Sequence, residues 1–389
     1  MAACKKSSPL PGLYIHVPFC VKKCPYCAFY SVTDLSLTGS YVDSLLKEME
    51  FQAAGSGFSG FDTVYFGGGT PSLLTPSQIK AVLDRAAGLF SLAGDLSVTL
   101  EANPKTVSRK TLEGYRAAGV NRINFGVQSF NGENLKFLGR IHDSGDAKKA
   151  LADARKAGFT DVGLDLIFGL PGHSPESWRA DLAEALSFSP EHLSCYMLTI
   201  EKDSPFGAMR EKGRAMSADD GLLADLFLLT HEVLTGAGYI HYEVSNYSKS
   251  HGFLSRHNVK YWNGAPYLGL GPSAHSFDGT SRRWNAGNLY DYLAMAGKGG
   301  SACEGREELS GRDRILETLF IGLRQAEGID VGAFSGMAGL DFFEVFGGAF
   351  KRCENEGWLI LSEGRVRPTP HGMLFSDGMA RLFIESLEE

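Results

Sequence analysis

Short apolar runs alternate with amphipathic stretches from Gly12 to about Ile200. The run Gly163–Phe168 is continuous enough to be typical of a strand buried on both faces. We predict six strands, at Leu13–Val17, Thr63–Phe66, Ser97–Glu101, Arg122–Phe125, Val162–Ile167 and Leu193–Leu198. Helical patterns lie between them, as at Tyr41–Glu50, Gln78–Leu89 and Ala147–Ala157. This alternation predicts an α/β fold with a parallel sheet, and six units suit an incomplete (β/α)6 barrel better than a closed eight-unit one.

The pattern changes after about residue 218. A helix is predicted at Asp219–Thr235 and a strand at Tyr239–Val244, and the glycine- and aromatic-rich stretch Tyr261–Trp284 leaves the strand–helix rhythm. Gly297–Ser301 has the composition of a linker. Beyond it the pattern predicts a smaller helical, winged-helix-like domain, from helices at Asp313–Gln325, Phe342–Glu354 and Met373–Leu387 and strands at Trp358–Leu361 and Arg365–Pro368. The predicted divisions are therefore 1–250, 251–300 and 301–389.

Three cysteines, Cys20, Cys24 and Cys27, follow the first predicted strand within eight positions. Structural zinc takes four ligands, commonly in two pairs, and His16 lies on the predicted strand, so a zinc knuckle is the weaker interpretation. Three soft thiolates instead suit a [4Fe–4S] cluster with one iron left open. An open iron is where the amino and carboxylate groups of S-adenosylmethionine (SAM) would bind. The other cysteines, Cys4, Cys195, Cys303 and Cys353, are expected to be buried or incidental thiols.

Composition narrows the class of protein. The 389 residues are 43% hydrophobic and 21% charged, which is typical of a globular chain of two or three domains. A net charge of -7 argues against a nucleic-acid partner. No secretory signal and no apolar run of membrane-spanning length is evident, so we expect a cytoplasmic protein without an integral membrane segment.

Several polar or glycine-rich positions follow predicted strands, where a barrel carries its chemistry. Gly67-Gly68-Gly69-Thr70 follows the second strand and lets a ligand approach the backbone, although such a run is also a common tight turn. No Gly-Lys-Ser/Thr follows, which excludes a P-loop. Glu101 could accept hydrogen bonds from a ribose diol or could simply be solvated. Gln128, Arg140 and Asp165 lie near the ends of later strands.

A second group of residues that could bind a ligand lies at Arg256–Trp262. His257 could ligate a metal or haem iron through a neutral ring nitrogen, and Tyr261 and Trp262 could cover a flat ligand. The alternative is a capping turn with a core tryptophan.

Together these motifs resemble the radical SAM family that contains oxygen-independent coproporphyrinogen III oxidase and the HemW haem chaperones. The resemblance covers nearly the whole chain. Besides the cysteine triplet, the matching segments are Tyr14–Cys20, Phe66–Pro71, Glu101–Pro104, Asn124–Ser129, Leu138–Arg140, Asp165–Pro171 and Gly269–His275.

The resemblance implies that Cys20, Cys24 and Cys27 hold the cluster and that Tyr14, Gly68 and Glu101 contact its SAM. A second SAM in the oxidase is held by residues similar to a further set, which is Tyr26, Gly69, Thr70, Gln128, Arg140, Asp165 and, more loosely, Met197. No catalytic residue is identified.

Two departures separate the chain from the oxidase. The oxidase has a fourth cysteine where this chain has Phe29, and its long N-terminal segment contrasts with thirteen residues before Tyr14. Conversely, the pattern formed by His257, Asn258, Tyr261 and Trp262 resembles the mark of the haem chaperones.

We therefore expect a haem chaperone that binds haem and a SAM-ligated [4Fe–4S] cluster and passes haem to an acceptor protein. The alternatives are oxidative decarboxylation of coproporphyrinogen III and SAM-dependent methylation or opening of a tetrapyrrole. Expected partners are the haem acceptor, an electron donor if SAM is cleaved, and a second copy in a homodimer.

Overall fold

The computed structural model describes residues 10–214 and 216–387. It divides the chain into two compact units, each built from separate stretches of sequence. Of the described residues, unit 1 contains 10–126, Ile141–Val162 and Ser255–Glu308. Unit 2 contains Val127–Arg140, Gly163–Leu254 and Leu309 onward.

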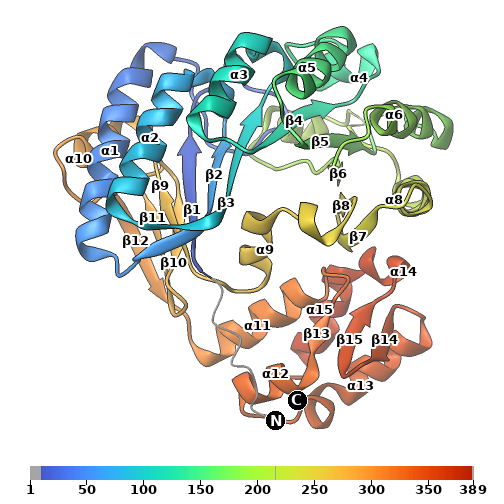
Figure 1. The fold of residues 1–389 in the computed structure, drawn as a ribbon. Helices are drawn as coiled ribbons and strands as arrows, with labels where there is room; N and C mark the ends of the chain where they lie inside the picture. Colours follow the sequence, from blue (N-terminus) through green and yellow to red (C-terminus); the bar gives the residue numbers. More distant parts are fainter. Residues whose placement is uncertain (1–9, 215, 388–389) are drawn as a thin grey trace. The chain divides into compact units, whose positions relative to one another are not determined.

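The sheet of unit 1 has β1 near its middle, and its strands are ordered β12-β11-β10-β9-β1-β2-β3-β4 (Figure 1). Their bounds are β1 Gly12–Val17, β2 Gly60–Gly68, β3 Ser91–Ala102, β4 Arg122–Gln128, β9 Tyr267–Leu270, β10 His275–Phe277, β11 Ser281–Asn285 and β12 Cys303–Glu308. Both neighbours of β1 run parallel to it, with Tyr14 level with Tyr65 on β2 and with Gly269 on β9. Strands β10 to β12 extend this sheet as antiparallel hairpins.

The helices of unit 1 connect its strands. They are α1 Thr38–Gly55, α2 Pro76–Leu89, α3 Arg109–Ala118, α5 Ser144–Lys156, α9 Arg256–Trp262 and α10 Leu289–Ala296. Local sequence sets their ends: Thr75 and Gln78 form a capping box at the start of α2. Gly119 ends α3 with a left-handed φ of 112°, a conformation that suits glycine. Figure 1 shows α10 beside α1, although the two are far apart in sequence.

Unit 2 continues the strand–helix alternation and adds a helical C-terminal part. Its first elements are α4 Gly132–Phe137, β5 Asp161–Phe168, α6 Pro175–Ser187, β6 His192–Met197, α7 Pro205–Glu211, α8 Asp220–Gly236, β7 Ile240–Glu243 and β8 Asn246–Ser248. Strand β6 pairs in parallel with β5 and antiparallel with β8.

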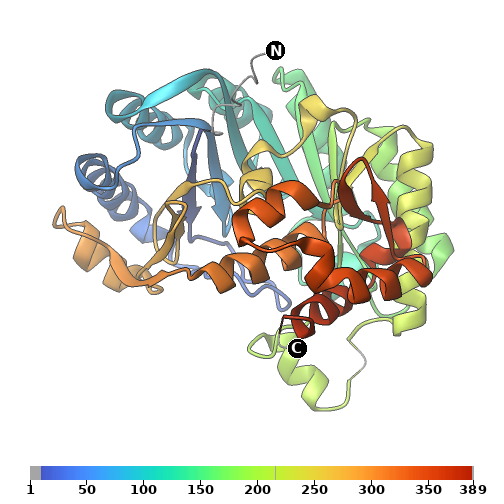
Figure 2. The ribbon, with the colours of Figure 1, turned by 90° about the horizontal axis from the view of Figure 1, so that it is seen from below.

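The C-terminal part combines helices with a sheet of order β13-β15-β14, a winged-helix-like arrangement. Its elements are α11 Gly311–Gly322, β13 Ile329–Asp330, α12 Val331–Ala338, α13 Phe342–Asn355, β14 Leu359–Ser362, β15 Arg365–Pro368, α14 Pro370–Met373 and α15 Ser376–Glu385. Figure 2 shows these helices, orange to red, gathered together. They enclose an apolar core that includes Phe334, Phe342, Phe346 and Phe383.

The six predicted strands β1 to β6 are confirmed, most of them longer than predicted. Three short strands in the stretch 261–284, and β8, were missed because each has only three to five residues. The glycine-rich segment 297–301 was predicted as a linker. It lies within unit 1, between α10 and β12, and β12 rejoins the sheet by pairing with β11. No helix in the described part of the chain has both the length and the apolar character needed to cross a membrane.

Candidate functional site

The three-cysteine segment is a loop that follows β1 and is closed at its base by backbone hydrogen bonds. The Cys20 N–H donates to the Val32 carbonyl at 2.9 Å, and the Val32 N–H donates to the Pro18 carbonyl at 2.6 Å. Within the loop, the Cys27 N–H donates to the Cys24 carbonyl at 3.1 Å. All three cysteines are half-buried. The backbone hydrogen bonds hold the base of the loop that carries them.

The cysteine sulfurs lie near enough to influence one another. Burial raises the pKa of Cys27, a backbone hydrogen bond from Phe29 lowers it, and the neighbouring Cys24 and Cys20 raise it further. The Thr70 hydroxyl is 3.5 Å from the Cys20 sulfur. In the ranges 10–214 and 216–387, no three His, Cys, Asp or Glu side chains converge tightly enough to hold one metal ion. Three neighbouring soft thiols on a loop are a donor set that fits an iron–sulfur cluster.

The glycine run after β2 packs its backbone against the chain that leads into the cysteine loop. The Gly69 N–H donates to the Val17 carbonyl at 2.8 Å, and the Thr70 N–H donates to the Phe19 carbonyl at 2.7 Å. A Cβ on Gly69 would lie 2.7 Å from the Phe19 oxygen, so this approach requires glycine. Gly68 has a φ of 104°, and a Cβ there would meet the His16 ring at 2.7 Å.

Glu101 lies at the end of β3, where it is reached by a tyrosine from the neighbouring strand. The Tyr65 hydroxyl donates to Glu101 Oε1 at 2.6 Å. Tyr14 lies level with Tyr65 on β1, and the two rings stack with centroids 6.3 Å apart. Burial, with Glu101 nearby, raises the pKa of Tyr14 above its usual value.

The hydrogen bonds of His16 show that the Tyr14 hydroxyl donates to its ring. His16 Nε2 lies 3.1 Å from the Tyr30 carbonyl, which can only accept, so Nε2 carries the hydrogen. Burial lowers the pKa of His16, and the neutral ring therefore accepts at Nδ1. The Tyr14 hydroxyl donates to this nitrogen at 3.2 Å. Tyr14 thus supports the site through His16, beneath the glycine run.

His257 lies on α9 with both ring nitrogens engaged. Nδ1 lies 2.9 Å from the Thr63 hydroxyl, and Nε2 lies 2.9 Å from the Tyr261 hydroxyl. The side chain is buried, with 3% of its surface exposed, and its ring stacks on Tyr65 at 5.1 Å. Burial lowers the pKa of His257 to about 3, and the charge of Lys260 lowers it in the same direction. In this conformation His257 is neutral and presents no nitrogen to a ligand at the surface.

Helix α9 is tied to the strands of unit 1 by ion pairs. Lys260 Nζ lies 2.6 Å from Asp62 Oδ1 and donates to the Leu10 carbonyl at 2.5 Å. Arg256 pairs with Asp62 at 3.3 Å and with Asp95 at 3.1 Å. Lys260 is buried, so loss of Asp62 would leave an uncompensated charge inside the protein. The other members of the predicted motif, Asn258, Tyr261 and Trp262, are half-buried.

The remaining predicted residues, apart from Tyr26, lie in unit 2. Gln128 ends β4 with a φ of 70°, a left-handed conformation that is strained for a residue with a Cβ. Its Oε1 is buried without a hydrogen-bond partner in the described structure, as is typical of a group that awaits a ligand. Next to it, the Ser129 hydroxyl donates to Asp181 at 2.5 Å and fixes the turn. Arg140 and Asp165 are half-buried, and Met197 is exposed.

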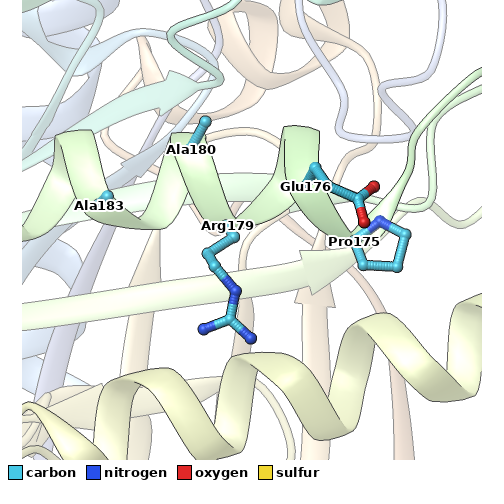
Figure 3. Close-up of a pocket in the computed structure, with 5 residues that line it drawn as sticks. All are labelled: Pro175, Glu176, Arg179, Ala180 and Ala183. Atoms are coloured by element: carbon cyan, nitrogen blue, oxygen red, sulfur yellow. The ribbon is translucent and has the colours of Figure 1, made fainter.

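Sequence reasoning missed Tyr65 and Thr63, which connect the predicted residues Glu101 and His257. Their signal was the alternation Thr63-Val64-Tyr65-Phe66, which places both on the same face of β2. A pocket of about 420 Å³ lies along α6 and is lined by Pro175, Glu176, Arg179, Ala180 and Ala183. Figure 3 shows these five side chains. None of the predicted site residues lines it.

Comparisons with known proteins agree with this geometry. The family model of the radical SAM superfamily matches residues 14–185, and that of the HemN C-terminal domain matches residues 309–375. The chain is 36% identical over 388 residues to the haem chaperone HemW of Escherichia coli, covering 97% of this chain and 99% of that one. It is 32% identical over 381 residues to that of Bacillus subtilis, covering 97% and 100%. A mouse protein, radical S-adenosyl methionine domain-containing protein 1, mitochondrial, is 33% identical over 99% of this chain and 90% of its own.

Among solved structures, coproporphyrinogen III oxidase from E. coli, a radical SAM enzyme, superposes with a TM-score of 0.82. It is 26% identical, and the match covers 98% of this chain and 91% of that one. The strand–helix units and the three-cysteine loop thus define a radical SAM protein with a HemN-type C-terminal domain. The predicted fold, an incomplete barrel followed by a smaller helical C-terminal domain, is confirmed. Within this class, the chain belongs to the family of the HemW haem chaperones.

Proposed function

We propose that this chain binds haem together with a SAM-ligated [4Fe–4S] cluster and transfers the haem to an acceptor protein. The observation that carries the proposal is the match to curated haem chaperones over almost the full length of both chains. Phe29 adds support, because it replaces a cysteine of the oxidase and is 65% exposed at the edge of the cysteine loop.

Cys20, Cys24 and Cys27 are the proposed cluster ligands, and Thr70 lies beside the first of them. When bound, such a cluster with SAM supplies one-electron chemistry. The protein's own contribution is to present three thiolates and to keep backbone close to the ligand at Gly68 and Gly69. Glu101, oriented by Tyr65, is the proposed acceptor for the ribose hydroxyls, and Tyr14 is the proposed aromatic neighbour of this SAM.

A second SAM is also proposed, from the resemblance to the oxidase. Gln128 has the strongest support, since its strained backbone and unpartnered buried oxygen are typical of a ligand contact. The other members of this proposed set are Tyr26, Gly69, Thr70, Arg140, Asp165 and Met197.

The haem is cargo, and the motif on α9 is its proposed contact. Asn258, Tyr261 and Trp262 are the half-buried part of the motif, whereas His257 is buried. Iron ligation by His257 would require the ring to give up its contact with either Thr63 or Tyr261, because the ring nitrogen that ligates iron cannot keep its present hydrogen bond. We therefore propose that haem first meets the half-buried side chains and that ligation by His257 follows a displacement of α9.

Haemin titration of the anaerobically reconstituted protein tests the proposal. A stoichiometric Soret shift, followed by transfer of haem to an apo-protein acceptor, is expected. Trp262→Ala and Asn258→Ala should each weaken haem binding, whereas Asn263→Ala, a neighbouring exposed change, should not. Absence of stoichiometric binding would refute the chaperone function.

The second candidate is oxygen-independent coproporphyrinogen III oxidation, which is favoured by the TM-score of 0.82 to that enzyme. Incubation with coproporphyrinogen III, SAM and a reductant separates the two. The chaperone proposal expects no protoporphyrinogen, and robust decarboxylation would establish the enzyme instead. The predicted electron donor and homodimer remain predictions.

A further inference from the structure

Helix α9 packs near the starts of β1 and β2, whereas the cysteine loop follows the end of β1. His257 meets Thr63 near the start of β2, and a Cβ on Gly12, the first residue of β1, would lie 2.9 Å from its ring. Figure 1 shows α9 near the first residues of β1. Six-residue β1 spans roughly 17–20 Å, so the motif helix lies too far from the cysteine loop for direct contact.

A column of side chains leads from α9 to Glu101. From the α9 end, the His257 ring stacks on Tyr65 at 5.1 Å with an angle of 26° between the planes. The Tyr65 hydroxyl then donates to Glu101 Oε1 at 2.6 Å. Tyr14 completes the stack, 6.1 Å from His257 and 6.3 Å from Tyr65, with both angles at 27°.

Tyr65 is held between two neighbours. On one side is Gly67, where an added Cβ would lie 2.9 Å from the Tyr65 ring. On the other side is His257, whose own ring is fixed at both nitrogens by Thr63 and Tyr261. Removal of the imidazole would let the Tyr65 ring move away from Glu101, because packed rings keep their rotamers only while their neighbours fill the space.

We propose that His257 is a positioning residue for the SAM site: its ring fixes Tyr65, and the Tyr65 hydroxyl orients the Glu101 carboxylate toward the ribose. The inference rests on the proposed contact between Glu101 and SAM, and it requires no haem. It gives the motif on α9 a role in the haem-free protein that is separate from iron ligation. Because one ring cannot serve both roles at once, release of His257 toward haem would weaken SAM binding.

The test measures SAM affinity on the reconstituted, haem-free protein by equilibrium dialysis, with the EPR spectrum of the reduced cluster before and after SAM. His257→Leu keeps the volume of the side chain but removes its ring and both hydrogen bonds. It should raise the SAM Kd about five- to tenfold, the scale of one lost hydrogen bond. Tyr65→Phe should have a similar effect, and the double variant should be no worse than either single one.

Two controls make the outcome decisive. His192→Leu removes another buried histidine that is bonded to a tyrosine hydroxyl, at 2.6 Å from Tyr242, and should leave the SAM Kd unchanged. Glu101→Gln tests the site itself and should weaken SAM binding. If Glu101→Gln weakens binding but His257→Leu does not, the inference fails and the proposed site stands. If Glu101→Gln has no effect, the proposed SAM site is wrong and the inference falls with it.

A second variant covers the case in which His257→Leu does not fold. Thr63→Val combined with Tyr261→Phe keeps the imidazole but removes both hydrogen bonds that fix it, so the ring can shift from its stack on Tyr65. The same increase in SAM Kd is expected, and an unchanged Kd would overturn the inference.

Discussion

The Glu48 carboxylate accepts a hydrogen bond from the Tyr292 hydroxyl at 2.7 Å, although 244 positions separate the two residues. The same buried carboxylate accepts from the Gly271 N–H at 2.9 Å and from the Asn285 amide at 2.6 Å. It thereby links α1 to the segment after β9, to β11 and to α10. Burial raises the pKa of Glu48 to about 7, while its three donors lower it.

Glu48→Gln should destabilise the protein because both side-chain oxygens of Glu48 accept hydrogen bonds, and the amide nitrogen that replaces one of them can only donate. At pH 5 a loss of about 1–3 kcal/mol in the free energy of unfolding is expected. The raised pKa means that the wild type loses stability as the pH rises from about 4.5 to about 7, and the variant does not. The penalty should therefore shrink at pH 8. Urea unfolding at both pH values measures it, with the exposed Glu50→Gln as control, and a penalty that grows with pH would contradict the assignment.

Gly69→Ala should disturb the base of the cysteine loop. The added Cβ would meet the backbone oxygens of Phe19 at 2.7 Å and Val17 at 2.9 Å, and backbone cannot move as a flexible side chain can. A loss of about 1–3 kcal/mol in unfolding free energy is expected, together with a lower iron content after reconstitution. Gly88→Ala lies in α2 with open space around it and should instead stabilise by about 0.5–1 kcal/mol. Thermal unfolding of the two variants should move in opposite directions.

Serine at Cys20, Cys24 or Cys27 should abolish cluster assembly, because each thiolate would bind a separate iron. Iron content and the visible absorbance of the reconstituted protein measure this result, which should be about four irons per chain in the wild type. Cys303→Ser is the matched control, since Cys303 is also half-buried but lies on β12. An unchanged iron content in any one of the three loop variants would remove that residue from the ligand set.

His257 should make the stability of the protein depend on pH. Its pKa is lowered to about 3 in the folded chain, against 6.5 for an ordinary histidine, so the unfolded state binds the proton first as the pH falls. Stability should therefore be lost as the pH falls from about 6.5 toward 3, by up to roughly 1.4 kcal/mol per pH unit for one group. His257→Leu removes this contribution. The difference between wild type and variant, measured by unfolding at pH 7 and pH 5, should shift in favour of the variant at pH 5.

The sequence predicted the repeating part of the fold well, because long strands and amphipathic helices carry clear periodicity. The cysteine triplet could be recognised from its spacing alone, since its three thiols lie in one short loop. The strand β9 was missed because Tyr267–Leu270 has only four residues, and its place beside β1 depends on pairing across the chain. Short strands of this kind are defined by their partners more than by their own residues.

The environment of His257 could not be predicted from the sequence either. The motif suggested an iron ligand at a surface, whereas the structure engages both ring nitrogens inside unit 1. That burial depends on Thr63 and Gly12, which are distant in sequence and chemically ordinary. Residue types indicated which chemistry is available at α9, and only the tertiary contacts show what the ring does there.

The position of β1 between β2 and β9 has a consequence for synthesis on the ribosome. The cysteine loop emerges early, but the strand on one side of its supporting β1 follows about 250 residues later, and the donors to Glu48 come later still. Until then β1 has an open edge, which is a place where chains associate wrongly. A cluster inserted before β9 has been synthesised would bind to a loop whose supporting sheet is incomplete. Cluster insertion into this protein should therefore follow translation.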